Sequence, residues 1–231
     1  MKRTAQQAAA RADPQGSLRV LDVGSCYNPL QEISCFKMTA LDLCPGHPSV
    51  FQSDFLKLQI GPRGGQIQVD DTATAGNTGG STACTAGGAD VDPHQGAGRL
   101  VSLPGGSFDA LVFSLVLSYL PHPMQRTQMM LKARQLLTEP GLLLLVTPHS
   151  TDSAPANGAR GVQQLGEWRA ALEALGFAQV RHEKLHSSHA LCFRTIGPLP
   201  ENPTLLPMPI AFDDQREIIL RVKADEESQE R

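Results

Sequence analysis

A mostly parallel, doubly wound α/β sheet is the fold that this 231-residue sequence predicts. Short, nearly continuous apolar runs recur along the chain, and such runs are typical of strands buried on both faces of a parallel sheet. Between the later runs stand segments of strong helix formers with apolar residues at helical spacing. Because strands that alternate with helices form right-handed βαβ units, this order predicts a parallel, Rossmann-like sheet.

Five apolar runs are the expected parallel strands. The first, Leu18 to Val23, ends in a glycine, and the next two are Lys37 to Leu43 and Phe51 to Leu56. The longest is Phe108 to Tyr119, and the run from Gly141 to Val146 is stopped by a Thr-Pro pair. Their length and apolar character predict buried strands rather than helices.

Two helices and a terminal hairpin complete the expected domain. Apolar residues recur at close to helical spacing from Met124 to Leu137, and Leu165 to Leu175 is a second helix followed by Gly176, the usual residue after a helix end. Two strand-like runs follow, at 177–185 and 189–196, separated by a short polar turn. We expect a hairpin that adds an antiparallel strand to the sheet.

Three segments lie outside this pattern. Residues 1–17 are predicted to be a disordered lead-in to a domain at 18–196. Residues 61–106 hold 12 of the 21 glycines and no aromatic residue, which predicts a disordered insertion because so little apolar surface can be buried there. Residues 197–231 are Pro-rich at the start and acidic at the end, and are predicted to be a tail in which only the run REIILRV could form a strand or short helix.

Charge and cysteine usage narrow the function classes. The formal net charge is −3 and the pI is near 6.1, so no global attraction to nucleic acid or anionic lipid is expected. No apolar run approaches the ~18 residues of a membrane span, and the N-terminus has no secretory signal pattern. The five cysteines form no Cys-x-x-Cys pair, which predicts free thiols and a cytosolic or nuclear protein.

Polar residues and one glycine follow the expected strands at intervals that suit a nucleoside ligand. Gly24 directly follows the first strand, where a bare backbone allows close approach, although the dinucleotide pattern G-x-G-x-x-G is absent. Asp42 ends the second strand, near the offset at which an acidic residue reaches a ribose hydroxyl. Asp54 and Phe55 suit an adenine edge and ring, and Ser114 lies beside the same crevice. A Rossmann-like domain with no ligand is the alternative.

Several longer motifs resemble one family, the S-adenosylmethionine sensor upstream of the TOR kinase complex, which is related to a fungal large-subunit ribosomal RNA adenine-N1 methyltransferase. The resemblance spans residues 18–196 apart from the insertion and is carried by VLDVGSCYNP, ALDL, SVFQSDFL, FDALVFSLVLSYLPHPMQR, LLTEPGLLLLVTPHS and WRAALEALGF. It implies a class I methyltransferase fold that binds S-adenosylmethionine. It also implies that the cofactor contacts are Gly24, Asp42, Asp54, Phe55 and Ser114.

The same resemblance implies a role in nutrient sensing. Proteins of this family inhibit TOR signalling in the cytoplasm, bind the GATOR and KICSTOR complexes, and are released by S-adenosylmethionine. Only 17 residues precede Leu18, where the family has a long helical region that closes over the ligand. The alternatives are a nucleolar methyltransferase acting on adenine N1 of ribosomal RNA, and a ligand-free interaction remnant.

The resemblance also implies an S-adenosylmethionine-dependent methyltransferase, but the sequence does not identify its catalytic residues. Methyl transfer from a sulfonium relies on alignment and needs no protein nucleophile. His149, after the fifth strand, and Tyr119 are the candidates that face the crevice, but an exposed loop histidine and an edge-capping tyrosine are the alternatives. His186 and His189 lack a third ligand nearby, so no metal site is predicted. Within the site, we expect Gly24→Ala to crowd the methionine moiety and Asp42→Ala to remove the ribose acceptor.

Overall fold

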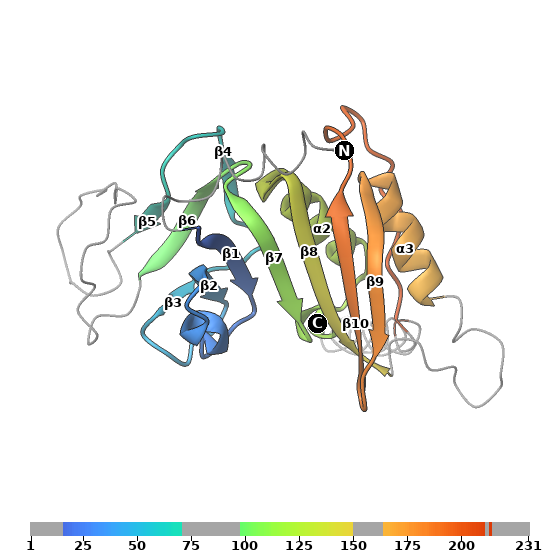
Figure 1. Cartoon of the computed structure of the whole chain (residues 1–231), viewed down its shortest axis with the longest axis horizontal. Coiled ribbons are helices and arrows are strands. Elements are labelled where there is room, and N and C mark those ends of the chain that lie inside the picture. The colour runs from blue at the N-terminus through green and yellow to red at the C-terminus, as the bar shows by residue number, and fades with distance from the viewer. Residues whose placement is uncertain (1–15, 71–97, 150–163, 211–212, 214–231) are drawn as a thin grey trace, which may run out of the picture.

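One sheet organises the chain in the computed structural model, which describes residues 16–70, 98–149, 164–210 and 213 (Figure 1). The strand order is β4-β6-β3-β2-β1-β7-β8-β10-β9, and β5 pairs with β6 outside this path. The strands are β1 Leu18–Val23, β2 Phe36–Asp42, β3 Val50–Gln52, β4 Gln59–Gly61, β5 Gln68–Asp70, β6 Arg99–Pro104, β7 Phe108–Ser114, β8 Leu137–Pro148, β9 Phe177–Lys184 and β10 Ser188–Thr195.

The centre of the sheet is parallel, as the apolar runs predict. β1 lies between β2 and β7 and is parallel to both, and β7 is parallel to β8. β10 is antiparallel to β8 on one side and to β9 on the other, so the terminal hairpin inserts one antiparallel strand. The predicted fold class, a mostly parallel doubly wound sheet with an antiparallel terminal hairpin, is confirmed.

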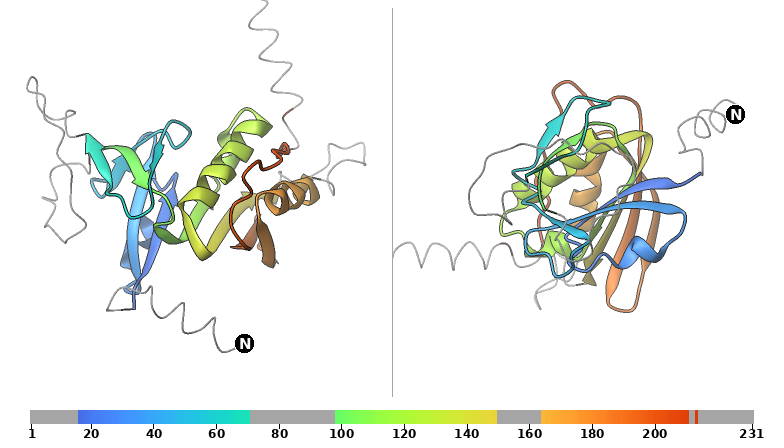
Figure 2. Two further views of the ribbon diagram at one scale, coloured as in Figure 1. Left: turned by 90° about the horizontal axis from the view of Figure 1, so that it is seen from above. Right: turned by 90° about the vertical axis from the view of Figure 1, so that its left-hand side faces the viewer.

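Two helices, α2 (Pro123–Leu136) and α3 (Gln164–Ala174), pack on the same face of this sheet (Figures 1 and 2). Helix α2 begins with proline at its first position, where no amide hydrogen is needed, and the His122 ring accepts a hydrogen bond from the Met124 amide at 3.2 Å. Gly176, at φ +78°, follows α3 as predicted. Between β1 and β2 the chain forms a short 3-10 turn, η1 (Pro29–Glu32).

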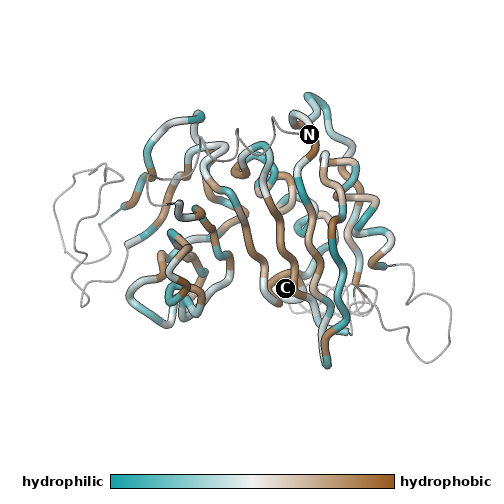
Figure 3. The backbone as a smooth tube through the Cα atoms, in the orientation of Figure 1, coloured by the Kyte–Doolittle hydropathy of each residue, from teal (hydrophilic) through white to brown (hydrophobic). Residues whose placement is uncertain are grey.

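The core lies between the sheet and these helices. Phe113 of β7, Met130 of α2, Trp168 of α3 and Phe177 of β9 are all buried there, and the brown central strands in Figure 3 trace this apolar layer. Trp168 is therefore a core residue, in agreement with its place on an amphipathic helix. None of the described helices combines the length and the apolar character that a membrane span requires.

Two segments pack where the sequence predicts disorder or a longer strand. β5 and β6 lie inside the glycine-rich stretch 61–106, and Leu100 and Leu103 of β6 are buried. β6 is hydrogen-bonded to β4 on one side and to β5 on the other, and amino-acid composition gives no information about such pairing. Residues 71–97 of this insertion lie outside the described residues. The apolar run 108–119 divides into β7 and the 3-10 turn η3 (Val116–Tyr119).

The folded unit also extends beyond residue 196. Residues 206–210 and Asp213, here called the C-terminal strap, lie against α2 and α3, and Met208 and Ile210 belong to the same buried core. The packed structure therefore extends beyond the predicted domain limit at residue 196. The sequence did not indicate this extension, because Met208 and Ile210 are single apolar residues next to prolines and show no strand or helix periodicity. Residues 1–15 of the predicted lead-in (1–17) and the whole REIILRV run lie outside the described residues.

Candidate ligand-binding site

A cavity of about 630 Å³ opens at the carboxyl ends of β1, β2, β3 and β7. This edge is where open α/β sheets bind ligands, and the volume falls within the ~300–1,000 Å³ typical of small-molecule sites. All five residues proposed from the sequence line this one cavity, namely Gly24, Asp42, Asp54, Phe55 and Ser114. The structure therefore brings the predicted site residues together, and their contacts with a ligand remain predictions.

Gly24 has a structural reason for being glycine that differs from the expected one. Its φ is +78°, and a Cβ built there would lie 2.7 Å from Cγ2 of Val116 in η3. The bare backbone thus admits the Val116 side chain, and alanine would collide with η3 before it crowded a ligand. The backbone amide of Gly24 donates to the Leu41 carbonyl at 2.8 Å, which joins the ends of β1 and β2.

Asp42 is fixed at the end of β2 by two backbone amides. Its Oδ1 accepts from the Cys44 amide at 2.8 Å and its Oδ2 accepts from the Cys26 amide at 3.0 Å. These bonds hold the loops after β1 and β2 against each other and orient the carboxylate at the cavity. Each carboxylate oxygen has a second lone pair, so both can also accept a hydrogen bond from a ligand hydroxyl.

Asp54 and Phe55 form the opposite wall in a tight turn. Oδ1 of Asp54 accepts from the Leu56 amide at 3.0 Å, and its Oδ2 lies 3.4 Å from Nζ of Lys57. Phe55 is buried, and its ring meets the Phe113 ring edge-to-face with centroids 5.6 Å apart. The phenyl ring therefore supports the core as well as lining the cavity.

Backbone strain is concentrated at this same edge. Among the described residues, the non-glycine residues with positive φ are Cys26 (49°), Asn28 (53°) and Leu115 (62°), which follow β1 and β7. Such conformations cost roughly 1–3 kcal/mol each and cluster at functional sites. Leu115 turns the chain from Ser114 into η3, which brings Val116 and Tyr119 to the cavity.

Two carboxylates, those of Asp42 and Asp54, lie in the otherwise mostly apolar lining of the cavity, and a third, that of Asp22, belongs to the residue just before the lining residue Val23. Burial of Asp22, one strand position before Val23, raises the pKa of its carboxyl, a hydrogen bond with Ser25 lowers it, and the Asp42 charge raises it further. Asp42 and Asp54 add two more carboxylates at the lining itself. An environment with this sign favours a ligand that carries positive charge.

Two cations of α2 hold the cavity walls, and neither is evident from the sequence. Nζ of Lys132 donates to the carbonyls of Leu56 and Leu58, both at 2.6 Å, in the loop that carries Asp54 and Phe55. Burial lowers the pKa of Lys132, and the nearby Asp54 charge opposes this shift. Arg126 holds η3 in the same way, with Nε donating to the Leu117 carbonyl at 3.1 Å. Their sequence signal is only a charged residue inside an apolar helical pattern.

The candidate catalytic and metal residues lie in two places. Tyr119 lines the mouth of the cavity and is 80% exposed. His149 does not line the cavity. Its Nε2 is 3.1 Å from the Ser188 carbonyl oxygen, and its ring lies against that of His189. His189 pairs with His182 rather than with His186, at 3.0 Å between Nδ1 and Nε2. Within the described part of the chain, no group of three or more side chains is arranged to hold a metal ion.

The strand order and the cavity at the strand ends define a protein with a class I methyltransferase fold. The family model described as 25S rRNA (adenine(2142)-N(1))-methyltransferase, Bmt2, matches residues 101–201. The chain is similar to the S-adenosylmethionine sensor upstream of mTORC1 of Danio rerio, with 35% identity over 183 residues, which are 79% of this chain and 41% of the relative. The Xenopus laevis protein of the same name is 37% identical over 179 residues, 78% of this chain and 39% of the relative.

The resemblance to the sensor family and its methyltransferase relatives is thereby confirmed, and the chain spans about two fifths of the length of these relatives. Solved structures also align with it. An S-adenosylmethionine-dependent methyltransferase of Mesorhizobium loti has a TM-score of 0.48 and 16% identity over 82% of this chain and 96% of that one. The [4+2]-cyclase SpnF has a TM-score of 0.49 and 13% identity over 86% of this chain and 81% of that one.

Proposed function

We propose that this protein binds S-adenosylmethionine in the cavity at the ends of β1, β2, β3 and β7. The observation that carries the proposal is the convergence of Gly24, Asp42, Asp54, Phe55 and Ser114, which come from separate parts of the sequence, on one cavity of about 630 Å³. Methyltransferase and sensor names among its relatives support the same ligand.

The chemistry of the lining suits this ligand. In the proposed complex the two Asp42 oxygens accept hydrogen bonds from the ribose hydroxyls, in addition to the amides that already hold them. Apolar walls from Val116, Leu120 and Met129 cover the adenosine, and the carboxylates of Asp42 and Asp54 in the lining favour the positively charged sulfonium. The chain's own role is to bind and orient the cofactor, which would supply the transferable methyl group.

We further propose that the bound ligand controls an interaction within the TOR pathway, in the cytoplasm. Two relatives that cover most of this chain are named as S-adenosylmethionine sensors upstream of mTORC1, which supports this role. GATOR and KICSTOR components are the proposed partners. A sensor of this kind requires that the ligand bind one state of the protein more tightly than another, since equal affinities would shift no equilibrium.

Asp42→Asn tests the ligand site directly. Asparagine keeps the size of the side chain but has one oxygen acceptor and no charge, so we expect S-adenosylmethionine affinity to fall more than tenfold, or ~1.4 kcal/mol. Isothermal titration calorimetry measures the change, with Glu173→Gln on the exposed face of α3 as the matched loss of one carboxylate. Absence of binding to wild-type protein at millimolar ligand would refute the proposal and favour a ligand-free interaction module. Equal affinity of Asp42→Asn and wild type would refute this site.

Methyl transfer is a second candidate function, favoured by the match of residues 101–201 to the rRNA adenine methyltransferase family. This stretch includes β7 and η3, whose exposed Tyr119 stands at the cavity mouth where an acceptor base would approach. Incubation with methyl-labelled S-adenosylmethionine and total RNA tests it. Transfer of the label to RNA would support a methyltransferase. If the protein binds S-adenosylmethionine but the RNA stays unlabelled, and if the ligand alters the capture of GATOR or KICSTOR components, the results would support the sensor.

A further inference from the structure

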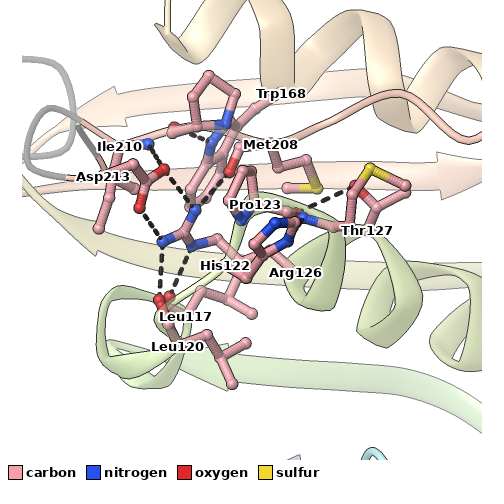
Figure 4. Close-up of polar contacts among 12 residues, drawn as sticks. Leu117, Leu120, His122, Pro123, Arg126, Thr127, Trp168, Met208, Ile210 and Asp213 are labelled. Carbon is pink, nitrogen blue, oxygen red and sulfur yellow. Dashed lines mark hydrogen bonds and ion pairs between the residues drawn. The ribbon is translucent and has the colours of Figure 1, made fainter. Parts of the chain in front are cut away.

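A fully buried arginine joins the wall of the cavity to the C-terminal strap. The guanidinium of Arg126 has five N–H donors, and all five are used (Figure 4). Nε and one Nη2 hydrogen bond go to the carbonyls of Leu117 and Leu120, at 3.1 and 2.8 Å. The other three go to the Met208 carbonyl at 2.8 Å and to the two carboxylate oxygens of Asp213, at 2.8 and 2.7 Å.

On one side of Arg126, these bonds fix η3. The carbonyls that it holds belong to Leu117 and Leu120, and η3 and the residue after it supply Val116, Tyr119 and Leu120 to the cavity lining. Val116 in turn packs on the Gly24 backbone, as its 2.7 Å approach to a built Cβ shows. A displacement of the guanidinium would therefore move a wall of the cavity.

On the other side, the strap is held by contacts that converge on α2 and α3. The Thr127 hydroxyl donates to the Leu206 carbonyl at 2.5 Å, and the Trp168 ring N–H donates to the Pro209 carbonyl at 2.7 Å. The Asp213 carboxylate also accepts from the Ile210 amide at 2.7 Å, which closes the end of the strap. None of the described strap residues lines the cavity.

The Arg126–Asp213 ion pair makes this junction sensitive to the loss of either partner. The Arg126 side chain is 0% exposed and that of Asp213 is 13% exposed. Removing one partner of a buried, hydrogen-bonded ion pair leaves a charge without compensation, which is far more costly than the loss of a surface pair. When the strap leaves α2, the guanidinium loses the carboxylate and one carbonyl and must be rehydrated, so the carbonyls of η3 lose their fixed donor as well.

We propose that Arg126 and Asp213 are positioning residues that couple the strap to the ligand cavity. Docking of the strap holds η3 in the form that binds ligand, and an occupied cavity holds η3 in the form that retains the strap. Because coupling free energy is reciprocal, any partner that pulls the strap away weakens ligand binding by the same factor by which the ligand weakens that partner. The coupling to a ligand rests on the proposed S-adenosylmethionine site.

Hydrogen exchange without ligand tests the structural half of this coupling. In Asp213→Asn we expect faster amide exchange in peptides covering residues 116–120 as well as in the strap, while peptides covering 54–58 keep the wild-type rate. Glu173→Gln is the matched control, because it removes the carboxylate of the exposed Arg169–Glu173 ion pair. It should change the exchange rate neither at residues 116–120 nor in the strap. Unchanged exchange at 116–120 in Asp213→Asn would overturn the coupling whatever the protein binds.

Ligand titration tests the functional half. In wild-type protein, S-adenosylmethionine should slow exchange in residues 206–210, and Asp213→Asn should weaken its binding at least fivefold, the lower end of typical allosteric couplings. If Asp213→Asn does not fold, Thr127→Val replaces it, because valine has nearly the same volume but lacks the hydroxyl that donates to the Leu206 carbonyl of the strap, and it should weaken binding in the same direction. Binding to wild type with no protection of the strap would overturn the inference. If wild-type protein does not bind S-adenosylmethionine at all, the proposed function is overturned. The hydrogen-exchange experiment without ligand then decides by itself whether the strap is coupled to η3.

Discussion

Asp22 is a buried carboxylate that the fold keeps at a cost. Its pKa is raised above 3.8, first by burial and then by the charge of Asp42, against the effect of the Ser25 hydrogen bond. A raised pKa means that the folded protein holds the proton more tightly than the unfolded chain. The stability associated with this proton is complete below pH 3.8 and is lost as the pH rises through the folded-state pKa.

We therefore expect Asp22→Asn to raise the free energy of unfolding at neutral pH, because asparagine keeps an oxygen acceptor without the charge. The gain should shrink as the pH falls and vanish below 3.8, where the aspartate is protonated in both states. Urea unfolding of wild type and variant at a series of pH values measures it. Asp109 provides the contrast: burial raises its pKa but hydrogen bonds from Arg19 lower it overall, so Asp109→Asn should destabilise the protein at neutral pH. An equal effect of Asp22→Asn at all pH values would contradict the burial argument.

Gly24 and Gly64 offer a matched pair for the contact with η3. Their φ angles are +78° and +77°, so alanine is strained by a similar amount at both positions. At Gly64 nothing lies within 4 Å of the new Cβ, whereas at Gly24 it meets Val116 at 2.7 Å. We expect Gly24→Ala to lower the free energy of unfolding by at least ~1 kcal/mol more than Gly64→Ala. Equal losses in thermal or urea unfolding would show that η3 does not rest on Gly24.

At the scale of elements, both walls of the cavity are hydrogen-bonded to side chains of α2. Arg126, near its start, holds η3, and Lys132, two turns later, holds the loop that carries Asp54 and Phe55. Both side chains donate to backbone carbonyls, so they fix the path of the chain without restricting which side chains the loops carry. This explains how loops without regular structure keep the candidate site in place.

Lys132→Met tests this attachment. Methionine fills a similar volume but leaves the carbonyls of Leu56 and Leu58 without their donor, so we expect a loss of about 1–3 kcal/mol in unfolding free energy. Faster amide exchange should appear in residues 54–58 and not in 116–120. Lys57→Met is the control, because this lysine lies in the same loop but its side chain is 85% exposed, and it should change stability by less than ~0.5 kcal/mol. Similar effects of the two substitutions would remove the special role of Lys132.

At the scale of the whole molecule, a single tryptophan reports on the packed unit. Trp168 of α3 is fully buried, its ring N–H donates to the strap, and it is the chain's only tryptophan. Its fluorescence should therefore shift to longer wavelength in the same transition in which far-ultraviolet circular dichroism is lost. Because it is also bonded to the strap, it senses the undocking of that segment.

A ligand that binds only the folded state must stabilise the whole unit. At a concentration of 100 times its dissociation constant, S-adenosylmethionine should raise the free energy of unfolding by ~2.7 kcal/mol. Unfolding followed by Trp168 fluorescence measures the shift, and Asp42→Asn at the same ligand concentration should show a much smaller one. A full shift in Asp42→Asn would mean that the ligand binds elsewhere on the protein.

The sequence was sufficient for the architecture of the parallel sheet and for the composition of the candidate site. Apolar runs report burial on both faces, and helical periodicity is a local property, so β1, β2, β7, β8, α2, α3 and the hairpin could all be predicted within a few residues. Gly24, Asp42, Asp54 and Ser114 could be placed together because the carboxyl ends of parallel strands meet at one edge. The strand β6 was hidden, because the glycine-rich insertion surrounding it dominates the composition.

Only the tertiary structure decided what holds that edge in place. The contact of Val116 with Gly24 joins residues of two different strand ends, and the Arg126–Asp213 pair joins residues 87 positions apart. Neither has a periodic or spaced signature, because a buried cation can take any carbonyl or carboxylate that the packing brings within reach. Local patterns therefore determined which elements form and in what order. Long-range packing of the elements decided which groups Arg126 and Lys132 bind, and therefore the shape of the cavity. Local sequence patterns contain no information about this packing.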